Sequence, residues 1–188
     1  KGSIIIVLIF LLMTPVVSFA GYFKVMKMSE GLSNNTVKCI TQDRNGYIWL
    51  GTFDGLCRFD GDAFSVFRHH PENSSSINGD HISALLAVKD GLWIGTDKGL
   101  NFFSFAKNSF YPSYRLLPSG DKSKMTRRIV SIAAVGKRIF VLDSSGEFFI
   151  SKEGSLVFES SAYNTRTRWF SVVAYKNNTL LAYASDGI

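Results

Sequence analysis

The chain has 188 residues, 46% of them hydrophobic, and a formal net charge of +6. This apolar fraction is enough to bury a sizeable core. A nucleic-acid-binding surface needs a dense basic stripe, whereas here the basic residues are scattered apart from one cluster, so no nucleic acid partner is expected. The cluster consists of Lys122, Lys124, Arg127 and Arg128. We interpret it as a solvated loop between repeats, with contact to an anionic ligand as the alternative.

The first twenty residues differ from the rest of the chain. Lys1 precedes an apolar run from Ile4 to Met13, and Ser18-Phe19-Ala20 offers small residues at the two positions that a signal peptidase reads. Because the run is short for a membrane span, residues 1–20 are predicted to be a secretory signal peptide that is cleaved near Ala20. The remainder is then expected to be exported. An uncleaved N-terminal anchor is the alternative.

After this segment, a weak alternation predicts a strand at residues 22–26, and four-stranded units follow. In the first unit the expected strands are 37–42, 47–52, 56–59 and 63–67, joined by turns at Asn45-Gly46, Asp54-Gly55 and Asp60-Gly61. Three such hairpins make one up-and-down antiparallel sheet, which is one propeller blade. The later strands are expected at 82–88, 92–96, 100–105 and 109–111, then at 129–135, 138–142, 147–151 and 155–159, and finally at 169–175 and 179–184.

These units carry a repeated motif. The first copy runs Asn45-Gly46-Tyr47-Ile48-Trp49-Leu50-Gly51-Thr52-Phe53-Asp54-Gly55-Leu56, and the second runs Asp90-Gly91-Leu92-Trp93-Ile94-Gly95-Thr96-Asp97-Lys98-Gly99-Leu100. With two weaker copies, the corresponding glycines Gly55, Gly99, Gly146 and Gly187 are 44, 47 and 41 residues apart. A period in the forties with strand-like units is typical of radial β arrays. The motif residues are Trp49, Gly51, Thr52, Gly55, Trp93, Gly95, Thr96 and Gly99.

The sequence therefore predicts an all-β fold of β-propeller blades in an incomplete ring of about three and a half blades. The expected bounds are about 31–67, 77–111 and 125–159 for three blades and 168–188 for half of a fourth. Trp49 and Trp93 are expected to fill the gaps between adjacent blades, with a sugar-stacking platform as the minority alternative. Gly51 and Gly95 fit close backbone approach or a bend.

The cysteines and histidines predict no disulfide, metal site or cofactor. Cys39 and Cys57 fall on strands separated by one intervening strand, so their backbones are expected roughly 9–10 Å apart. This exceeds the ~7 Å limit for a disulfide, and both thiols are predicted to be unpaired. His69, His70 and His81 lie in or beside one loop with no acid or cysteine at ligand spacing, so a solvated loop is expected.

In a blade traced from centre to rim, the turn between strands two and three shares a face with the connection to the next blade. This face should carry Phe53-Asp54, Asp97-Lys98 and three longer loops, whereas the opposite face has only tight turns. The longer loops are residues 68–80, 112–128 and 160–168. Long loops on one face of a repeat array usually mark its binding face.

The first repeat resembles a known family. The pattern runs from Gly31-Leu32-Ser33 through Asp43-x-x-Gly46-x-Ile48-Trp49-Leu50-Gly51-Thr52 to Gly55-Leu56-x-Arg58-Phe59-Asp60, and it resembles the two-component regulator propeller repeat. The resemblance extends over nearly everything after the first twenty residues and is most specific in the first two repeats. In that family, one or two seven-bladed propellers precede an immunoglobulin-like domain, a membrane helix, a histidine kinase, a receiver and often a DNA-binding domain.

The resemblance implies a periplasmic, non-enzymatic, ligand-sensing segment of a hybrid two-component histidine kinase, of a kind best known in gut Bacteroidetes that degrade polysaccharides. It implies an oligosaccharide ligand, and a full-length parent that is a homodimer in the inner membrane. Kinase activity and the membrane helix would lie in a C-terminal part. Because the sequence stops at Ile188, we interpret the chain as an N-terminal fragment or truncated product of a sensor. Dimerisation of two half rings is the less favoured alternative.

Ligand contacts are expected from aromatic and arginine side chains on the loop-bearing face, since these suit sugar rings and their carboxylates. The candidates are Tyr114, Arg115, Arg127, Arg128, Arg166 and Trp169. The sequence contains no catalytic constellation, so the chain is not expected to be an enzyme. Two other functions stay open: a fragment of a secreted propeller lyase or glycosidase, and a short secreted propeller that binds proteins.

Overall fold

The computed structural model describes residues 24–152, 154–161, 169–175 and 179–184. The expected signal peptide (residues 1–20), Arg166 and Gly187 lie outside these residues, as does most of the loop 160–168. Within the described part, every element is a β-strand except one short 3-10 helix, η1 (Met28–Glu30). The protein is thus an all-β structure, as predicted.

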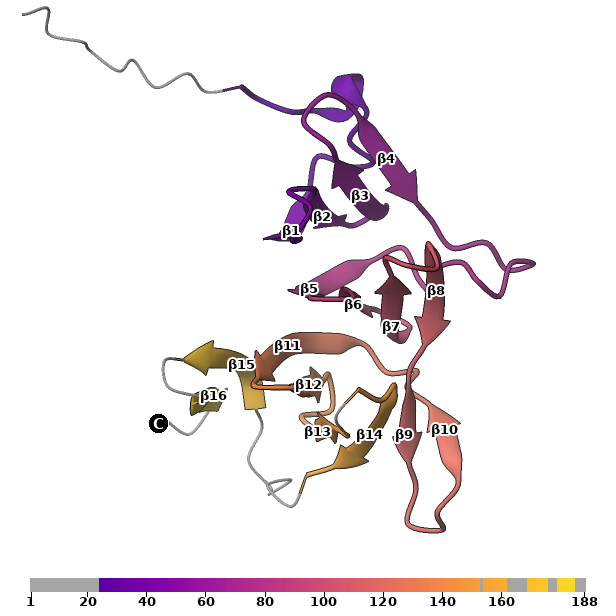
Figure 1. Cartoon of the computed structure of the whole chain (residues 1–188), viewed down its shortest axis with the longest axis vertical. Coiled ribbons are helices and arrows are strands. Elements are labelled where there is room, and N and C mark those ends of the chain that lie inside the picture. Colours follow the sequence, from indigo (N-terminus) through magenta and orange to yellow (C-terminus); the bar gives the residue numbers. More distant parts are fainter. Residues whose placement is uncertain (1–23, 153, 162–168, 176–178, 185–188) are drawn as a thin grey trace, which may run out of the picture.

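Blades 1 and 2 are four-stranded antiparallel sheets whose strands follow one another in sequence order (Figure 1). The bounds of the individual strands agree with the predicted strand ranges to within one residue, because glycines mark the turns. Gly55 and Gly99 have φ values of 112° and 119°, which other residues rarely adopt. The strands of blade 1 are β1 (Val37–Gln42), β2 (Ile48–Thr52), β3 (Gly55–Phe59) and β4 (Phe64–Phe67). Those of blade 2 are β5 (Ile82–Val88), β6 (Gly91–Thr96), β7 (Gly99–Ser104) and β8 (Ser109–Pro112).

Blade 3 contains the four predicted strands and two that the sequence did not predict. The extra strands, β9 (Tyr114–Leu116) and β10 (Lys122–Lys124), form a hairpin, and β9 pairs in parallel with β14 at the rim (Figure 1). Lys122 and Lys124 therefore lie in a strand and not in the predicted loop, although both are exposed as predicted. An edge strand with water on one side accommodates such lysines without burying their charge. The predicted strands are β11 (Ile129–Val135), β12 (Arg138–Asp143), β13 (Phe148–Ser151) and β14 (Val157–Ser160).

The first strand of each unit is innermost in the array. Strand β5 packs between β1 and β11, and β11 packs in turn against β15 (Trp169–Tyr175) (Figure 1). Strand β15 forms an antiparallel hairpin with β16 (Thr179–Ala184). Each inner strand has a register shift near its start, as between Ile82 and Ala84 in β5. Such bulges bend and twist a strand, which suits strands that curve around a common centre. The described blades do not close a ring.

The core lies between the blades. Trp49 of blade 1 is 1% exposed and packs against Phe103 of blade 2, with ring centroids 5.4 Å apart. Trp93 of blade 2 meets Phe158 of blade 3 edge-on, also at 5.4 Å. The prediction that the two tryptophans fill the gaps between adjacent blades is confirmed by these contacts. Burying large aromatic rings in this way supplies much of the free energy that holds blades together.

Glycines let the inner strands of successive blades approach closely. A Cβ atom on Gly51 would lie 2.5 Å from Cγ2 of Ile82, and one on Gly95 would lie 2.8 Å from Cβ of Ile129. Each isoleucine belongs to the inner strand of the next blade. The expected close backbone approach at Gly51 and Gly95 therefore occurs, and its partner is the neighbouring blade.

The segment before blade 1 is not a strand. Residues 24–26, the described part of the strand expected at 22–26, are not in a strand, because no partner strand pairs with them in the described part. They lead into η1, where Lys27 N donates to Glu30 Oε2 at 2.7 Å.

Cys39 and Cys57 are free thiols, as predicted. Burial raises the pKa of Cys39 to about 12.

Candidate ligand-binding face

The turns between the second and third strands lie beside the connections between blades, as predicted. Gly55 N donates to Asp80 O at 2.8 Å, so the first turn contacts the connection that enters blade 2. In blade 3, Ser144 N donates to Arg128 O, also at 2.8 Å, so that turn contacts the connection that enters its own blade. One face of the molecule, which we call the loop-bearing face, therefore gathers the 2–3 turns and the connecting segments.

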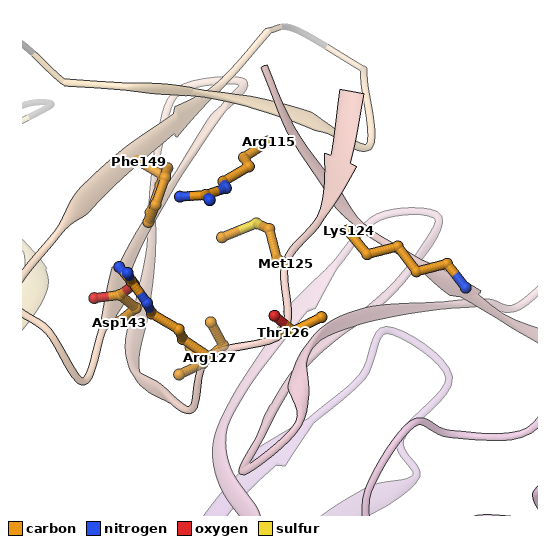
Figure 2. A pocket seen from close by; sticks show the side chains of 8 residues that line it. Arg115, Lys124, Met125, Thr126, Arg127, Asp143 and Phe149 are labelled. Carbon is orange, nitrogen blue, oxygen red and sulfur yellow. The ribbon is translucent and has the colours of Figure 1, made fainter. Parts of the chain in front are cut away.

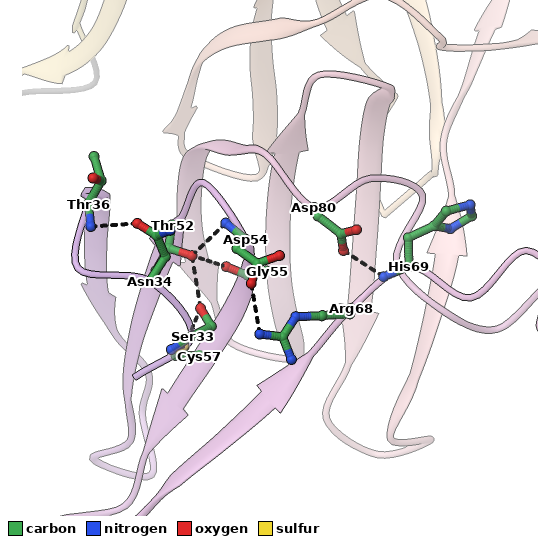
Figure 3. A network of polar contacts seen from close by, with 10 residues as sticks. All are labelled: Ser33, Asn34, Thr36, Thr52, Asp54, Gly55, Cys57, Arg68, His69 and Asp80. Atoms are coloured by element: carbon green, nitrogen blue, oxygen red, sulfur yellow. Dashed lines mark hydrogen bonds and ion pairs between the residues drawn. The ribbon is translucent and has the colours of Figure 1, made fainter. Parts of the chain in front are cut away.

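Motif threonines fix the shape of these turns. The Thr52 hydroxyl donates to Gly55 O at 2.9 Å and accepts from Asp54 N at 3.0 Å (Figure 3). In blade 2, Thr96 Oγ1 likewise accepts from Lys98 N at 3.0 Å and lies 3.1 Å from Gly99 O. Both threonines are fully buried, so they shape the face from beneath and do not offer a contact to a ligand.

The first turn is tied further into a chain of hydroxyl and thiol groups. The Cys57 thiol donates to Ser33 Oγ at 3.0 Å, and Ser33 Oγ lies 2.9 Å from Thr52 Oγ1 (Figure 3). On the surface above them, Arg68 pairs with Asp54 at 2.9 Å. Both members of this ion pair are about half exposed, so solvent screens it and it contributes little to stability.

Blade 3 uses a carboxylate where the first two blades use threonine. Asp143 Oδ1 accepts from Ser145 N at 2.8 Å and from Glu147 N at 3.0 Å, so it closes the turn that Thr52 and Thr96 close elsewhere. Asp143 is 3% exposed. Its other oxygen, Oδ2, lies 3.5 Å from Arg127 Nη1. The weakened third copy of the motif therefore adds a buried negative charge to the loop-bearing face.

Two of the predicted contact residues, Arg115 and Arg127, meet at a small pocket of about 40 Å³ beside this carboxylate (Figure 2). They share one partner, because Glu147 Oε2 lies 3.8 Å from Arg115 Nη1 and 3.2 Å from Arg127 Nη1. Lys124 also lines the pocket, but its side chain points away from the centre in Figure 2. The two arginines are thus held by acidic side chains of their own blade.

The remaining predicted contacts are not brought to this pocket. Tyr114 is half-buried in β9, opposite Val157 of β14. Arg128 is exposed on the segment that precedes β11. Trp169 opens β15 opposite Ala184, and its side chain lies outside the description, whereas Arg166 lies outside the described residues altogether.

A wider hollow of about 590 Å³, which we call the blade 2 groove, lies above blade 2 on the loop-bearing face. Its floor includes Asp97, Lys98 and Asn101, and its walls are the segment 69–81 on one side and residues 124–126 on the other. The sequence predicts Asp97-Lys98 and both connections on this face. It does not predict that they line one hollow, because their convergence depends on how the two connections fold.

A second hollow opens on the opposite face, between blades 2 and 3. It has a volume of about 520 Å³, and its apolar lining includes Trp93, Phe102 and Leu156. Ser151 lines it at the position where blade 2 carries Phe103, so a small side chain replaces a large ring there. The gap between these two blades is consequently less well filled than the gap between blades 1 and 2.

The described residues contain no group of three or more His, Cys, Asp or Glu side chains placed to hold a metal ion. His69 Nδ1 lies 2.8 Å from Ile77 O, and the His81 ring meets Phe53 edge-on, so these histidines make contacts of another kind. Nor is any helix in the described ranges long and apolar enough to cross a bilayer.

Comparison with known proteins agrees with the repeat seen in blade 1. Residues 31–54 match the family model described as two component regulator propeller. A stretch of 56 residues is 46% identical to histidine kinase P4 of Formosa agariphila, and it covers 30% of this chain and 4% of that protein. The chain thus corresponds to a small part of this curated relative.

Solved structures share the fold. The extracellular domain of a protein described as a hybrid two component system from B. thetaiotaomicron superposes with a TM-score of 0.60 at 20% identity, over 78% of this chain and 19% of that chain. A computationally designed protein, Ika4, gives 0.60 at 14% identity, over 89% and 95%. The WD40 domain of Pan2 from Neurospora crassa gives 0.55 at 14%, over 79% and 44%. At such identities the likeness shows the β-propeller fold alone.

Proposed function

We propose that this chain, with its two component regulator propeller repeat, forms blades of the sensing propeller of a hybrid two-component histidine kinase. The observation that carries the proposal is the 46% identity to a histidine kinase over 56 residues. A propeller has no active site by virtue of its fold, so the function must be argued from its surfaces. Here one face bears the connections and the hollow above blade 2, which favours ligand binding over catalysis.

The ligand in this proposal is a glycan-derived oligosaccharide, and the sensing segment lies in the periplasm after export by residues 1–20. Two observations support the location: the short apolar segment ahead of the blades, and the fold shared with an extracellular domain. The segment is proposed to bind without catalysing a reaction. Ligand binding would shift the geometry of a dimer of the longer parent protein, and a membrane helix and kinase outside this chain would transmit the shift.

The proposal can be tested in the organism that carries the gene. In one strain, residues 24–160 are removed in frame, and transcripts are compared with the parent strain after addition of single oligosaccharides. We expect the mutant to lose its transcriptional response to one class of oligosaccharide while the shortened protein is still present on an immunoblot. An unchanged response to every oligosaccharide that induces the parent strain would contradict the proposal.

A further inference from the structure

The blade 2 groove has the dimensions of a small-molecule site. Its volume of about 590 Å³ falls within the roughly 300–1,000 Å³ that ligand pockets occupy. The pocket that holds Arg115 and Arg127 has only about 40 Å³, little more than the ~30 Å³ share of one water molecule in the liquid. Of these two hollows on the loop-bearing face, the groove alone can hold a sugar ring.

The charges that line the groove cancel. Asp80 and Asp97 contribute two negative charges, Lys98 and Lys124 contribute two positive charges, and the histidines are counted as neutral. A strongly anionic ligand gains no net attraction from this lining, because the repulsion of two carboxylates opposes the attraction of two lysines. An uncharged ligand with many hydroxyl groups can instead use both the carboxylates as acceptors and the lysines as donors.

The floor and one wall of the groove are locked together by the side chain of Asn78. Its Oδ1 accepts from Thr96 Oγ1 at 2.8 Å, and its Nδ2 donates to Lys98 O at 3.1 Å. Its backbone N donates to Asn101 Oδ1 at 2.7 Å. The 97–98 turn is therefore held before any ligand arrives, which lowers the entropy that binding must remove.

Asp97 lies on this fixed turn with unused capacity to accept hydrogen bonds. Its Oδ1 is buried, and no donor among the described residues contacts it. The close approach of Gly79, where a Cβ atom would lie 2.6 Å from Oδ1, holds the carboxylate in place. Since Oδ1 is closed to solvent, a ligand hydroxyl must reach the other oxygen of this carboxylate, and Asp97 as a whole is only half-buried where it lines the groove.

His69 supplies a second acceptor on the wall. Its backbone N donates to Asp80 Oδ1 at 2.7 Å, and its ring Nδ1 lies 2.8 Å from Ile77 O. Because a carbonyl oxygen can only accept, Nδ1 carries the hydrogen, and Nε2 of the neutral ring is left as an acceptor. Pro71 and Pro112 add apolar surface along the groove, against which the C–H face of a sugar can pack.

We propose that the blade 2 groove binds an uncharged saccharide of one or two rings. Asp97 and Nε2 of His69 accept hydrogen bonds from its hydroxyl groups, and Lys98 donates one. This inference rests on the proposed sensing function and adds to it the place and the charge of the ligand. It replaces the predicted arginine contacts, because Arg115 and Arg127 are already paired with Glu147.

The test is calorimetric titration of the whole chain with four probes: cellobiose, maltose and lactose, which are uncharged, and a chondroitin sulfate disaccharide, which is anionic. We expect at least one uncharged probe to bind and the anionic probe to fail. Asp97→Asn should weaken the binding roughly 10-fold, because it replaces a charged acceptor, and Lys98→Ala should weaken it less. Asp62→Asn is the matched control, since Asp62 is exposed beside the Asp60-Gly61 turn on the opposite face.

Thermal unfolding, followed by circular dichroism, confirms that each variant is folded before titration. Binding of the anionic probe alone would overturn the inference, as would binding of an uncharged probe that survives both Asp97→Asn and Lys98→Ala. In the second case saccharide binding by this propeller still stands and only its place is wrong. Failure of all four probes also overturns the inference, whereas the transcript experiment decides the sensing function separately.

Discussion

Replacing Asp43 by alanine tests how the repeat motif holds a blade together. Asp43 Oδ2 accepts from the indole Nε1 of Trp49 at 2.8 Å, and both side chains are buried. Its Oδ1 accepts from the backbone N of Asn45 at 2.8 Å and of Tyr47 at 3.1 Å. The acidic residue at the start of the motif thus closes the first turn and orients the tryptophan that fills the gap to blade 2.

The cost of Asp43→Ala follows from what happens to these three donors. Water can reach the exposed Asn45 and the half-buried Tyr47, so their backbone groups lose little. The indole N–H of Trp49 is left buried without an acceptor, which costs about 1–3 kcal/mol. Together the changes should lower the free energy of unfolding by about 2–4 kcal/mol. Asp43→Asn should cost less, because the amide oxygen still accepts.

Urea denaturation followed by circular dichroism measures this cost, with an unchanged dependence on denaturant as the sign that the folded state is intact. Asp60→Ala is the matched control: Asp60 also accepts two backbone N–H groups, but it is exposed and contacts no indole, so its loss should be smaller. A double-mutant cycle with Trp49→Phe isolates the bond. A coupling energy near zero between Asp43→Ala and Trp49→Phe would refute the reasoning.

Two further predictions concern the contacts between blades and the Cys39 thiol. Gly95→Ala should destabilise the chain by about 1–3 kcal/mol through overpacking against Ile129, and Ile129→Ala should relieve part of the clash when the two are combined; additive losses in urea denaturation would contradict this. Burial raises the pKa of Cys39 from 9.0 to about 12, so the unfolded thiol ionises first and the free energy of unfolding should fall as the pH rises from 9 towards 12. Cys39→Ala should remove this part of the slope, and an identical slope in the variant would contradict the assignment.

The strands could be predicted because local signals fix them. Asn45-Gly46 and the glycines after Thr52 and Thr96 mark turns whose backbone conformation other residues resist, and the apolar stretches between them have the length of strands. The inner strands β5 and β11 accordingly have the predicted bounds. The second strands β2 and β6 carry Trp49 and Trp93, and both rings are buried between blades, as predicted.

The β9–β10 hairpin could not be predicted in the same way. Strand β9 pairs with Val157 and Phe158 of β14, more than forty residues along the chain, and no local signal indicates a parallel partner at that distance. The lysines of β10, considered without their neighbours in space, are typical of a solvated loop. The weak alternation at residues 22–26 predicted a strand that the described residues 24–26 do not form. A strand needs a partner as well as an alternating pattern.

The candidate site was predictable as a face but not as a set of residues. Blade geometry placed the connections and the Asp97-Lys98 turn together, as the structure shows. The choice of Arg115 and Arg127 followed side-chain chemistry alone and could not anticipate Glu147, which pairs with both. Ion pairs of this kind depend on the hairpin that brings Arg115 beside β14, so they become visible only in three dimensions.

The most direct test of the central proposal is phosphorylation of the full-length protein that carries these blades. Membranes containing it are incubated with labelled ATP, with and without the uncharged saccharide that binds the chain best. We predict that the saccharide changes the incorporation of label, that Asp97→Asn removes the change, and that the control Asp62→Asn keeps it. Labelling that ignores every saccharide tested, or membranes that incorporate no label, would contradict a glycan-sensing histidine kinase.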